Sequence, residues 1–108
     1  MTDTLKNLAN IVLPATLHDV YTAPAVTTTI VNGIRLVNTS TSTISSTGYL
    51  LVSGSTAMRV IPKALSLTAG DLYSDSDPIT LGTGDKLQMA ASSSLSIHCV
   101  ISGIEHTT

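Results

Sequence analysis

Apolar and polar residues alternate with a period of two along most of the chain beyond Pro14. Because successive side chains of a strand point to opposite faces of a sheet, this alternation predicts half-buried strands. Turn-forming residues interrupt the pattern roughly every 8–12 residues, a spacing typical of sandwiches and barrels. No stretch after Pro14 has a convincing helical period. We predict strands over residues 17–22, 26–38, 44–53, 58–61, 64–68, 72–73, 79–81, 86–91 and 95–101.

One motif occurs twice. Residues 67–73 read Leu-Thr-Ala-Gly-Asp-Leu-Tyr, and residues 81–87 read Leu-Gly-Thr-Gly-Asp-Lys-Leu. Glycine adopts a positive φ without steric cost, and the aspartate beside it can accept hydrogen bonds from nearby backbone N–H groups. Two such reversals in close succession indicate strands that stack back and forth. We therefore predict an all-β fold, an antiparallel β-sandwich of jelly-roll type with about eight short strands and under about a tenth of its residues in helix.

The predicted core is aliphatic, because the chain contains no Phe and no Trp. In the long strand over 26–38, we expect Ile30, Ile34 and Leu36 on one side, with Asn32-Gly33 marking a bend or bulge. In the last strand, Leu95, Ile97, Cys99 and Ile101 are expected to face one way. The main predicted core residues are Ile30, Leu36, Leu51, Val60, Leu67, Leu87, Ile97 and Ile101.

Residues 1–13 differ from the rest of the chain. Leu5, Leu8 and Val12 follow a loose helical spacing, but Pro14 ends the segment, which is too short to be a stable helix by itself. We predict an N-terminal arm over 1–13 and one sandwich domain over 14–108. The three apolar side chains are candidate interaction residues that would contact a neighbouring subunit. A frayed terminus is the alternative.

The charge pattern argues against two classes of partner. Lys6, Arg35, Arg59, Lys63 and Lys86 are scattered along a chain of net charge −2, so there is no basic stripe to bind nucleic acid. No apolar run approaches the length of a transmembrane helix. The first residues do not resemble a signal peptide, so we expect synthesis in the cytoplasm of the cell that makes the protein.

Few residues are charged, and this matters more than the sign of the net charge. Only 11% of the residues are Asp, Glu, Lys or Arg, whereas 14 Ser and 17 Thr supply the polarity. A β-rich composition explains part of this, since Thr suits strands. So low a charge is nevertheless unusual for a soluble free monomer. The sharper hypothesis is that much of the surface is covered by other copies or by a partner.

No catalytic or metal-binding constellation is evident. His18, His98 and His106 lie on separate segments, and Asp75 and Asp77 lack the rest of a calcium loop. There is no nucleophile elbow or phosphate loop, and Glu105 is the only Glu. We read Cys99 as a small buried hydrophobe. An enzyme is therefore not expected, and no cofactor or metal is implied.

Two further patterns bear on carbohydrate. Asn38-Thr39-Ser40 matches the N-glycosylation acceptor, which we interpret as a chance match. Sugar-binding sites commonly use stacked aromatic rings, and only Tyr21, Tyr49 and Tyr73 are available. A free carbohydrate-binding module therefore stays open as an alternative of a different class.

The order of several features resembles small structural proteins of tailed-bacteriophage virions over roughly residues 16–105. The features are Tyr-Thr-Ala-Pro at 21–24, Ile-Arg-Leu-Val-Asn-Thr at 34–39, Arg59 with Pro62, the two Gly-Asp turns, a Pro-led strand, and Gly-Ile-Glu at 103–105. The resemblance implies a β-sandwich carried on a virus particle in many copies.

We therefore expect a capsid decoration (cement) protein located on the virion, with a tail or fibre component as the runner-up. The expected partners are the major capsid protein or other virion proteins, and a second or third copy of this chain in a homo-oligomer. The small number of aromatic residues weakens a receptor-binding role.

Overall fold

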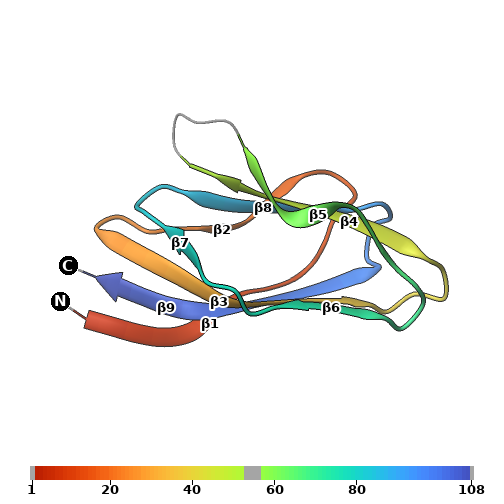
Figure 1. Ribbon diagram of the computed structural model, residues 1–108, viewed down its shortest axis with the longest axis horizontal. Coiled ribbons are helices and arrows are strands. Elements are labelled where there is room, and N and C mark those ends of the chain that lie inside the picture. Colours follow the sequence, from red (N-terminus) through yellow and green to blue (C-terminus); the bar gives the residue numbers. More distant parts are fainter. Residues whose placement is uncertain (1, 53–56, 108) are drawn as a thin grey trace.

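The computed structural model describes residues 2–52 and 57–107, all of whose regular elements are strands. They form two antiparallel sheets packed face to face, with the chain ends side by side at one end (Figure 1). The strands are β1 (Thr2–Val12), β2 (His18–Thr22), β3 (Thr27–Asn38), β4 (Ile44–Leu51), β5 (Met58–Leu67), β6 (Leu72–Asp75), β7 (Ile79–Leu81), β8 (Lys86–Ala91) and β9 (Ile97–Thr107).

The strand order is that of a jelly roll. One sheet has the order β1-β9-β3-β6 with β7 also paired to β3, and the other has the order β2-β8-β4-β5. Strands β6 and β7 follow one another along the same edge of β3 and act as one interrupted strand. Counted in this way, the first strand pairs with the last and the second with the next to last, as in the rolled-up hairpin of this fold. The predicted antiparallel sandwich is confirmed.

The repeated Gly-Asp motif produces the same local structure twice. Gly70 and Gly84 have φ values of 75° and 85°, and the following aspartate N–H closes each turn on the oxygen of Thr68 or Gly82. Each turn also exchanges two backbone hydrogen bonds with another segment. Gly70 and Asp71 bond Asn38 at the end of β3, and Gly84 and Asp85 bond Ala23, which follows β2. Both turns carry the chain from one sheet to the other.

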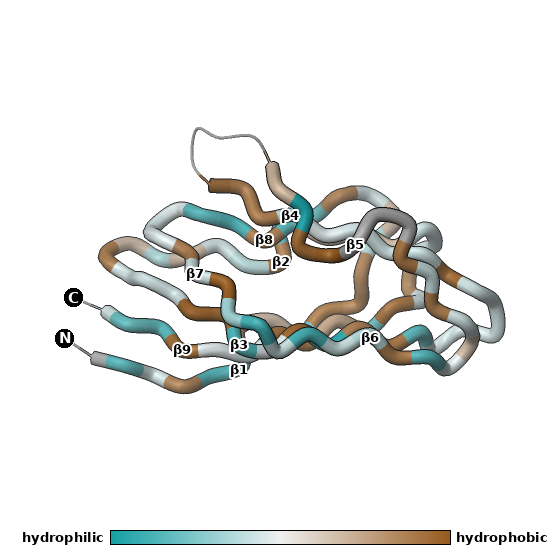
Figure 2. Tube along the Cα trace, in the orientation of Figure 1, coloured by the Kyte–Doolittle hydropathy of each residue, from teal (hydrophilic) through white to brown (hydrophobic). Residues whose placement is uncertain are grey.

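The core is aliphatic and lies between the sheets. Leu36, Leu67, Leu87, Ile97 and Ile101 are buried as predicted. Val60 is half-buried and packs against the core. Other inward residues, such as Leu13, Ile61, Leu81 and Met89, are fully buried. Apolar positions alternate with polar ones along the strands, as the hydropathy colouring shows (Figure 2).

Three expected inward positions are corrected. Ile30 is 38% exposed because the register of β3 shifts between Val31 and Gly33. Beyond the extra residue, inward and outward positions change places, so Ile30 faces outward while Ile34 faces the core. Leu95 is 77% exposed and has a φ of 63°, since it belongs to the turn before β9. Leu51, at the end of β4, is half-buried and lies outside the core.

The N-terminal segment is also corrected. Thr2–Val12 is a strand that pairs with β9 along its whole length, from Thr2 opposite Thr107 to Val12 opposite His98. Leu13, the last residue of the expected arm, is fully buried in the core. The helical spacing was misleading because the register shifts between Asn7 and Ala9, and this bulge hides the strand alternation.

Both bulges of this sheet lie beside the same place in β9. The extra residue of β1 is Leu8, between the partners of Ser102 and Ile101, and that of β3 is Asn32, between the partners of Gly103 and Ser102. A Cβ on Gly103 would meet the Ile30 carbonyl oxygen and would lie 2.8 Å from Leu8 Cδ1. Glycine is therefore required here by the close approach of two neighbouring strands.

Candidate interaction surfaces

The outer face of the β1-β9-β3-β6 sheet carries apolar side chains in rows that run across the strands. Leu5, Ile104 and Ile30 lie opposite one another on β1, β9 and β3. A second row contains Val12, His98, Val37 and Leu72. Leu5, Ile30, Val12 and Leu72 are 75%, 38%, 39% and 47% exposed. No described element of the chain covers these rows.

The structure separates the three candidate interaction residues of the N-terminal segment. Leu5 and Val12 lie on the outer face, whereas Leu8 occupies the bulge and packs partly buried against the core beside Gly103. Sequence reasoning missed Ile30 and Ile104 as their companions. The signal for Ile30 was the predicted bulge at Asn32-Gly33. A bulge reverses the alternation, so Ile30 and Ile34 on its two sides could have been assigned to opposite faces.

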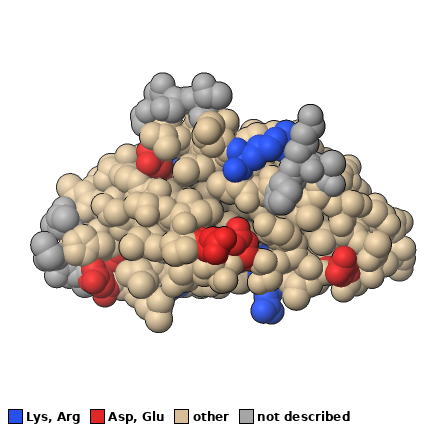
Figure 3. All heavy atoms as spheres, in the orientation of Figure 1, with Lys and Arg blue, Asp and Glu red and all other residues tan. Residues whose placement is uncertain are grey.

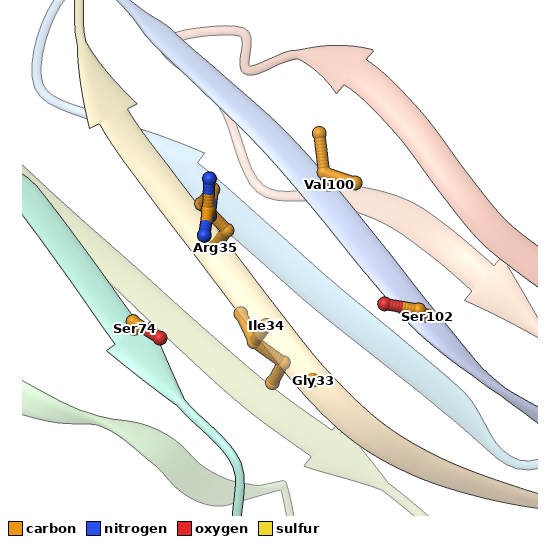
Figure 4. A pocket seen from close by; sticks show the side chains of 6 residues that line it. All are labelled: Gly33, Ile34, Arg35, Ser74, Val100 and Ser102. Carbon is orange, nitrogen blue, oxygen red and sulfur yellow. The ribbon is translucent and has the colours of Figure 1, made fainter.

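A shallow depression of about 330 Å³ lies in the middle of the same face. Figure 4 shows its lining on three neighbouring strands, where the missing side chain of Gly33 leaves room between Arg35, Ser74 and Ser102. Among the described residues, Arg35 has no carboxylate partner. The depression therefore presents a guanidinium and two hydroxyl groups, a set of hydrogen-bond donors suited to a carboxylate. It contains no His, Cys, Asp or Glu that could serve as an acid, base or nucleophile.

The outer face of the other sheet is polar along one row. Asp19, Gln88, Tyr49 and Arg59 lie opposite one another on β2, β8, β4 and β5. Gln88 Nε2 donates to Asp19 Oδ1 at 2.7 Å, and this bond, followed by the one from Lys86, lowers the pKa of Asp19. Arg59 lies 4.9 Å from the ring centroid of Tyr49. The row is largely satisfied within the chain.

Tyr21 connects the two sheets at the end where the termini lie. Its hydroxyl donates to Glu105 Oε2 at 2.5 Å and lies 2.7 Å from Thr29 Oγ1, while Lys6 Nζ is 3.1 Å from Glu105 Oε1. Burial, and then the hydrogen bond to Glu105, raises the pKa of Tyr21 to about 12. The hydrogen bond from Tyr21 in turn lowers the pKa of Glu105, with a further contribution from Lys6. We call these four side chains the Tyr21 clasp.

The sequence did not single out Glu105, because it lies three residues from the C-terminus. The signal was present in the alternation of β9. Ile97, Cys99, Ile101 and Gly103 are buried, so the next residue of the same parity, Glu105, also turns inward. Its side chain is only 13% exposed.

We expect the protein to lose stability in acid, because the Tyr21 clasp stabilises the fold only while Glu105 is ionised. The folded pKa of Glu105 lies below its unfolded value of about 4.3, so its contribution is complete above that pH and is lost as the pH falls through the folded pKa. Glu105→Gln should lower the free energy of unfolding by about 1–3 kcal/mol at pH 7. Urea unfolding of both proteins should show that this difference in the free energy of unfolding shrinks as the pH falls through the folded pKa of Glu105. A gap that does not change with pH would contradict the role of the carboxylate.

The remaining candidates for chemistry are apart from one another. Cys99 is buried, as predicted, with its Sγ 3.8 Å from Met89 Sδ, and burial raises its pKa to about 12, which disfavours the thiolate form. His98 and His106 share strand β9, which corrects the expectation of three separate segments, and His18 lies on β2. His106 bonds Asp3, whereas His98 and His18 are exposed. Asp75 accepts the Asp77 N–H within its own loop. Within 2–52 and 57–107, no three His, Cys, Asp or Glu side chains are placed to hold a metal ion.

Asn38 has a structural role that the sequence analysis did not assign. Its side chain is fully buried, and Nδ2 lies 2.8 Å, 2.9 Å and 3.2 Å from the carbonyl oxygens of Ser42, Leu67 and Thr68. Its Oδ1 accepts from the N–H and hydroxyl of Ser40. Because the amide nitrogen is enclosed, the acceptor motif at 38–40 is not available for glycosylation in the folded chain.

Charged side chains are sparse on the molecular surface, as the space-filling view shows for one face (Figure 3). Several are paired within the chain, as in Lys6–Glu105 and Lys86–Asp19. No helix of the described chain is long and apolar enough to cross a membrane. Comparison with family models and with curated proteins gives no match for this chain.

Proposed function

We propose that this chain is a non-enzymatic structural protein of a tailed-bacteriophage virion, acting as a capsid decoration (cement) protein. The observation that carries the proposal is the outer face of the β1-β9-β3-β6 sheet, a wide and nearly uncharged surface with exposed apolar rows. Such a surface suits contact with another protein better than it suits water. The order of sequence motifs, which resembles virion proteins, gives the partner class, and jelly rolls are frequent in virus particles.

The proposed mechanism is to bridge neighbouring subunits of the capsid. The apolar rows would cover part of the major capsid protein, and Arg35 in its depression would donate hydrogen bonds to a carboxylate of that partner. Binding to the assembled shell stabilises the shell by mass action, so no chemistry or cofactor is needed. We also propose that the chain forms a homo-oligomer, a dimer or a trimer, and that it is located on the virion after synthesis in the host cytoplasm.

We expect particles that lack this protein to assemble but to lose their genome on heating or osmotic shock. The physical reason is that bridging contacts resist the internal pressure of the packaged genome. The measurement compares particles with and without the protein for released DNA over a temperature series. Adding the purified protein back should restore resistance, and Arg35→Ala should restore it less well.

Two other outcomes would point elsewhere. Particles that are fully stable but cannot attach to cells would favour the tail or fibre alternative.

A carbohydrate-binding module is favoured by Tyr49, which lies half-buried on an outer face between Gln88 and Arg59. That function would appear as a rise in melting temperature with added sugars, abolished by Tyr49→Ala.

A further inference from the structure

The sandwich has one long strand edge that the described chain leaves open. Natural proteins protect such edges with short strands, proline, bulges or charge. Short strands form two of the other three edges, with five residues in β2 at one edge and four in β6 and three in β7 along another. At the third, the ten-residue β5 contains Pro62, and its pairing with β4 shifts register twice. β1 has 11 residues and pairs with β9 alone among the described strands, and its bulge at Leu8 leaves residues 2–7 with a regular edge.

The charges on β1 do not guard this edge. Asp3 bonds His106 and Lys6 bonds Glu105, both partners lying on β9 within the same chain. Between these two charged residues lies Leu5, whose side chain is 75% exposed. An exposed leucine between two charged residues that already have partners on β9 is the opposite of the usual protection.

The hydrogen-bonding groups of Leu5 point outward. Leu13 N–H donates to the Ile97 oxygen, and Thr39 N–H donates to the Ser96 oxygen on the other side of β9. Because hydrogen-bonding direction alternates along a strand, Gly103 and Glu105 also turn toward β1. Their partners are Lys6 and Thr4, so Leu5 between them turns its N–H and C=O away from β9.

From these observations we infer that β1 pairs antiparallel with β1 of a second copy, about a twofold axis at Leu5, to form one continuous sheet. In this register Leu5 faces Leu5, Thr4 faces Lys6 and Asp3 faces Asn7 of the second copy, so no like charges are opposed. The apolar row Leu5–Ile104–Ile30 joins its counterpart across the axis. A twofold interface requires this kind of self-complementary surface. The inference deepens the proposed self-association and does not depend on the virion role.

The test is the mass of the purified full-length chain in solution, measured by light scattering over a range of concentrations. We expect the wild type to reach about twice 11.2 kDa. Leu5→Pro should remain a monomer, because proline removes only the outward N–H and is tolerated at an edge. Leu5→Lys should do the same by placing two charges at the axis. Leu95→Lys changes an equally exposed leucine elsewhere and should leave the dimer intact.

A cysteine at position 5 tests the register. Leu5→Cys should form a disulfide-linked dimer on mild oxidation, because directly opposed residues bring their Cβ atoms within about 5 Å. Leu95→Cys should not, and the buried Cys99 should not compete.

The outcomes separate this interface from self-association in general. A wild-type dimer that Leu5→Lys does not dissociate would overturn the β1 interface and leave self-association standing. A trimer would overturn twofold pairing. A wild type that stays monomeric at every concentration would overturn both, and would leave the virion role to be tested on particles.

Discussion

Gly103→Ala should lower the free energy of unfolding by about 3 kcal/mol or more, the largest loss we expect from adding a single methyl group. The new Cβ would meet the Ile30 carbonyl oxygen, which is backbone and cannot rotate away, as well as Leu8 Cδ1 at 2.8 Å. Relief of the clash would force β3, and the Leu8 side chain of β1, away from β9 at the two bulges. Urea unfolding should show a midpoint lower by roughly 1–3 M.

Gly33→Ala is the matched control. It adds the same methyl group at the neighbouring bulge, but the nearest atom is the hydroxyl of Ser102 at 3.3 Å, which can move. We expect it to cost less than about 1 kcal/mol. Equal effects of the two substitutions would contradict the close packing at Gly103 and the register of β9 between its neighbours.

Asn38→Asp should destabilise the fold by about 3–5 kcal/mol at pH 7. The substitution keeps the shape of a fully buried side chain but replaces an amide donor that faces three carbonyl oxygens with a carboxylate. A buried charge would then point at the negative ends of those carbonyls. Lower pH should restore part of the loss, because protonation removes the charge and returns one donor.

Asn10→Asp makes the same chemical change at an exposed position of β1. Its effect on the free energy of unfolding should remain within about 0.5 kcal/mol. If Asn38→Asp were equally mild in urea or thermal unfolding, then the amide would not join the end of β3 to the end of β5.

Local signals were enough to predict most of the fold. The Gly-Asp pairs at 70–71 and 84–85 predicted turns because only glycine enters the positive-φ region freely, and both turns are present. Alternation predicted the strands because its period is a property of each strand alone. It failed at residues 1–13 and at Ile30, where one extra residue reverses the parity of everything beyond it.

The candidate surface was less predictable, because it depends on register between strands that are distant in the sequence. Leu5, Ile104 and Ile30 form one row only after β1 and β3 have both paired with β9. Leu5 alone was singled out, from its place in a segment without a visible partner. Tyr21 and Glu105 are likewise separated by 84 positions and meet only when the two sheets pack together.

The central claim is that this chain acts on a virus particle through its outer sheet face, in many copies. The most direct measurement of this proposed role is a cryo-electron microscopy reconstruction of purified tailed-phage particles from cells that make this chain, with quantitative mass spectrometry of the same sample. We expect the jelly roll on the capsid exterior, its β1-β9-β3-β6 face against the major capsid protein, in numbers comparable to that protein. Particles that contain no copies, or only a few copies at the tail, would contradict the decoration role.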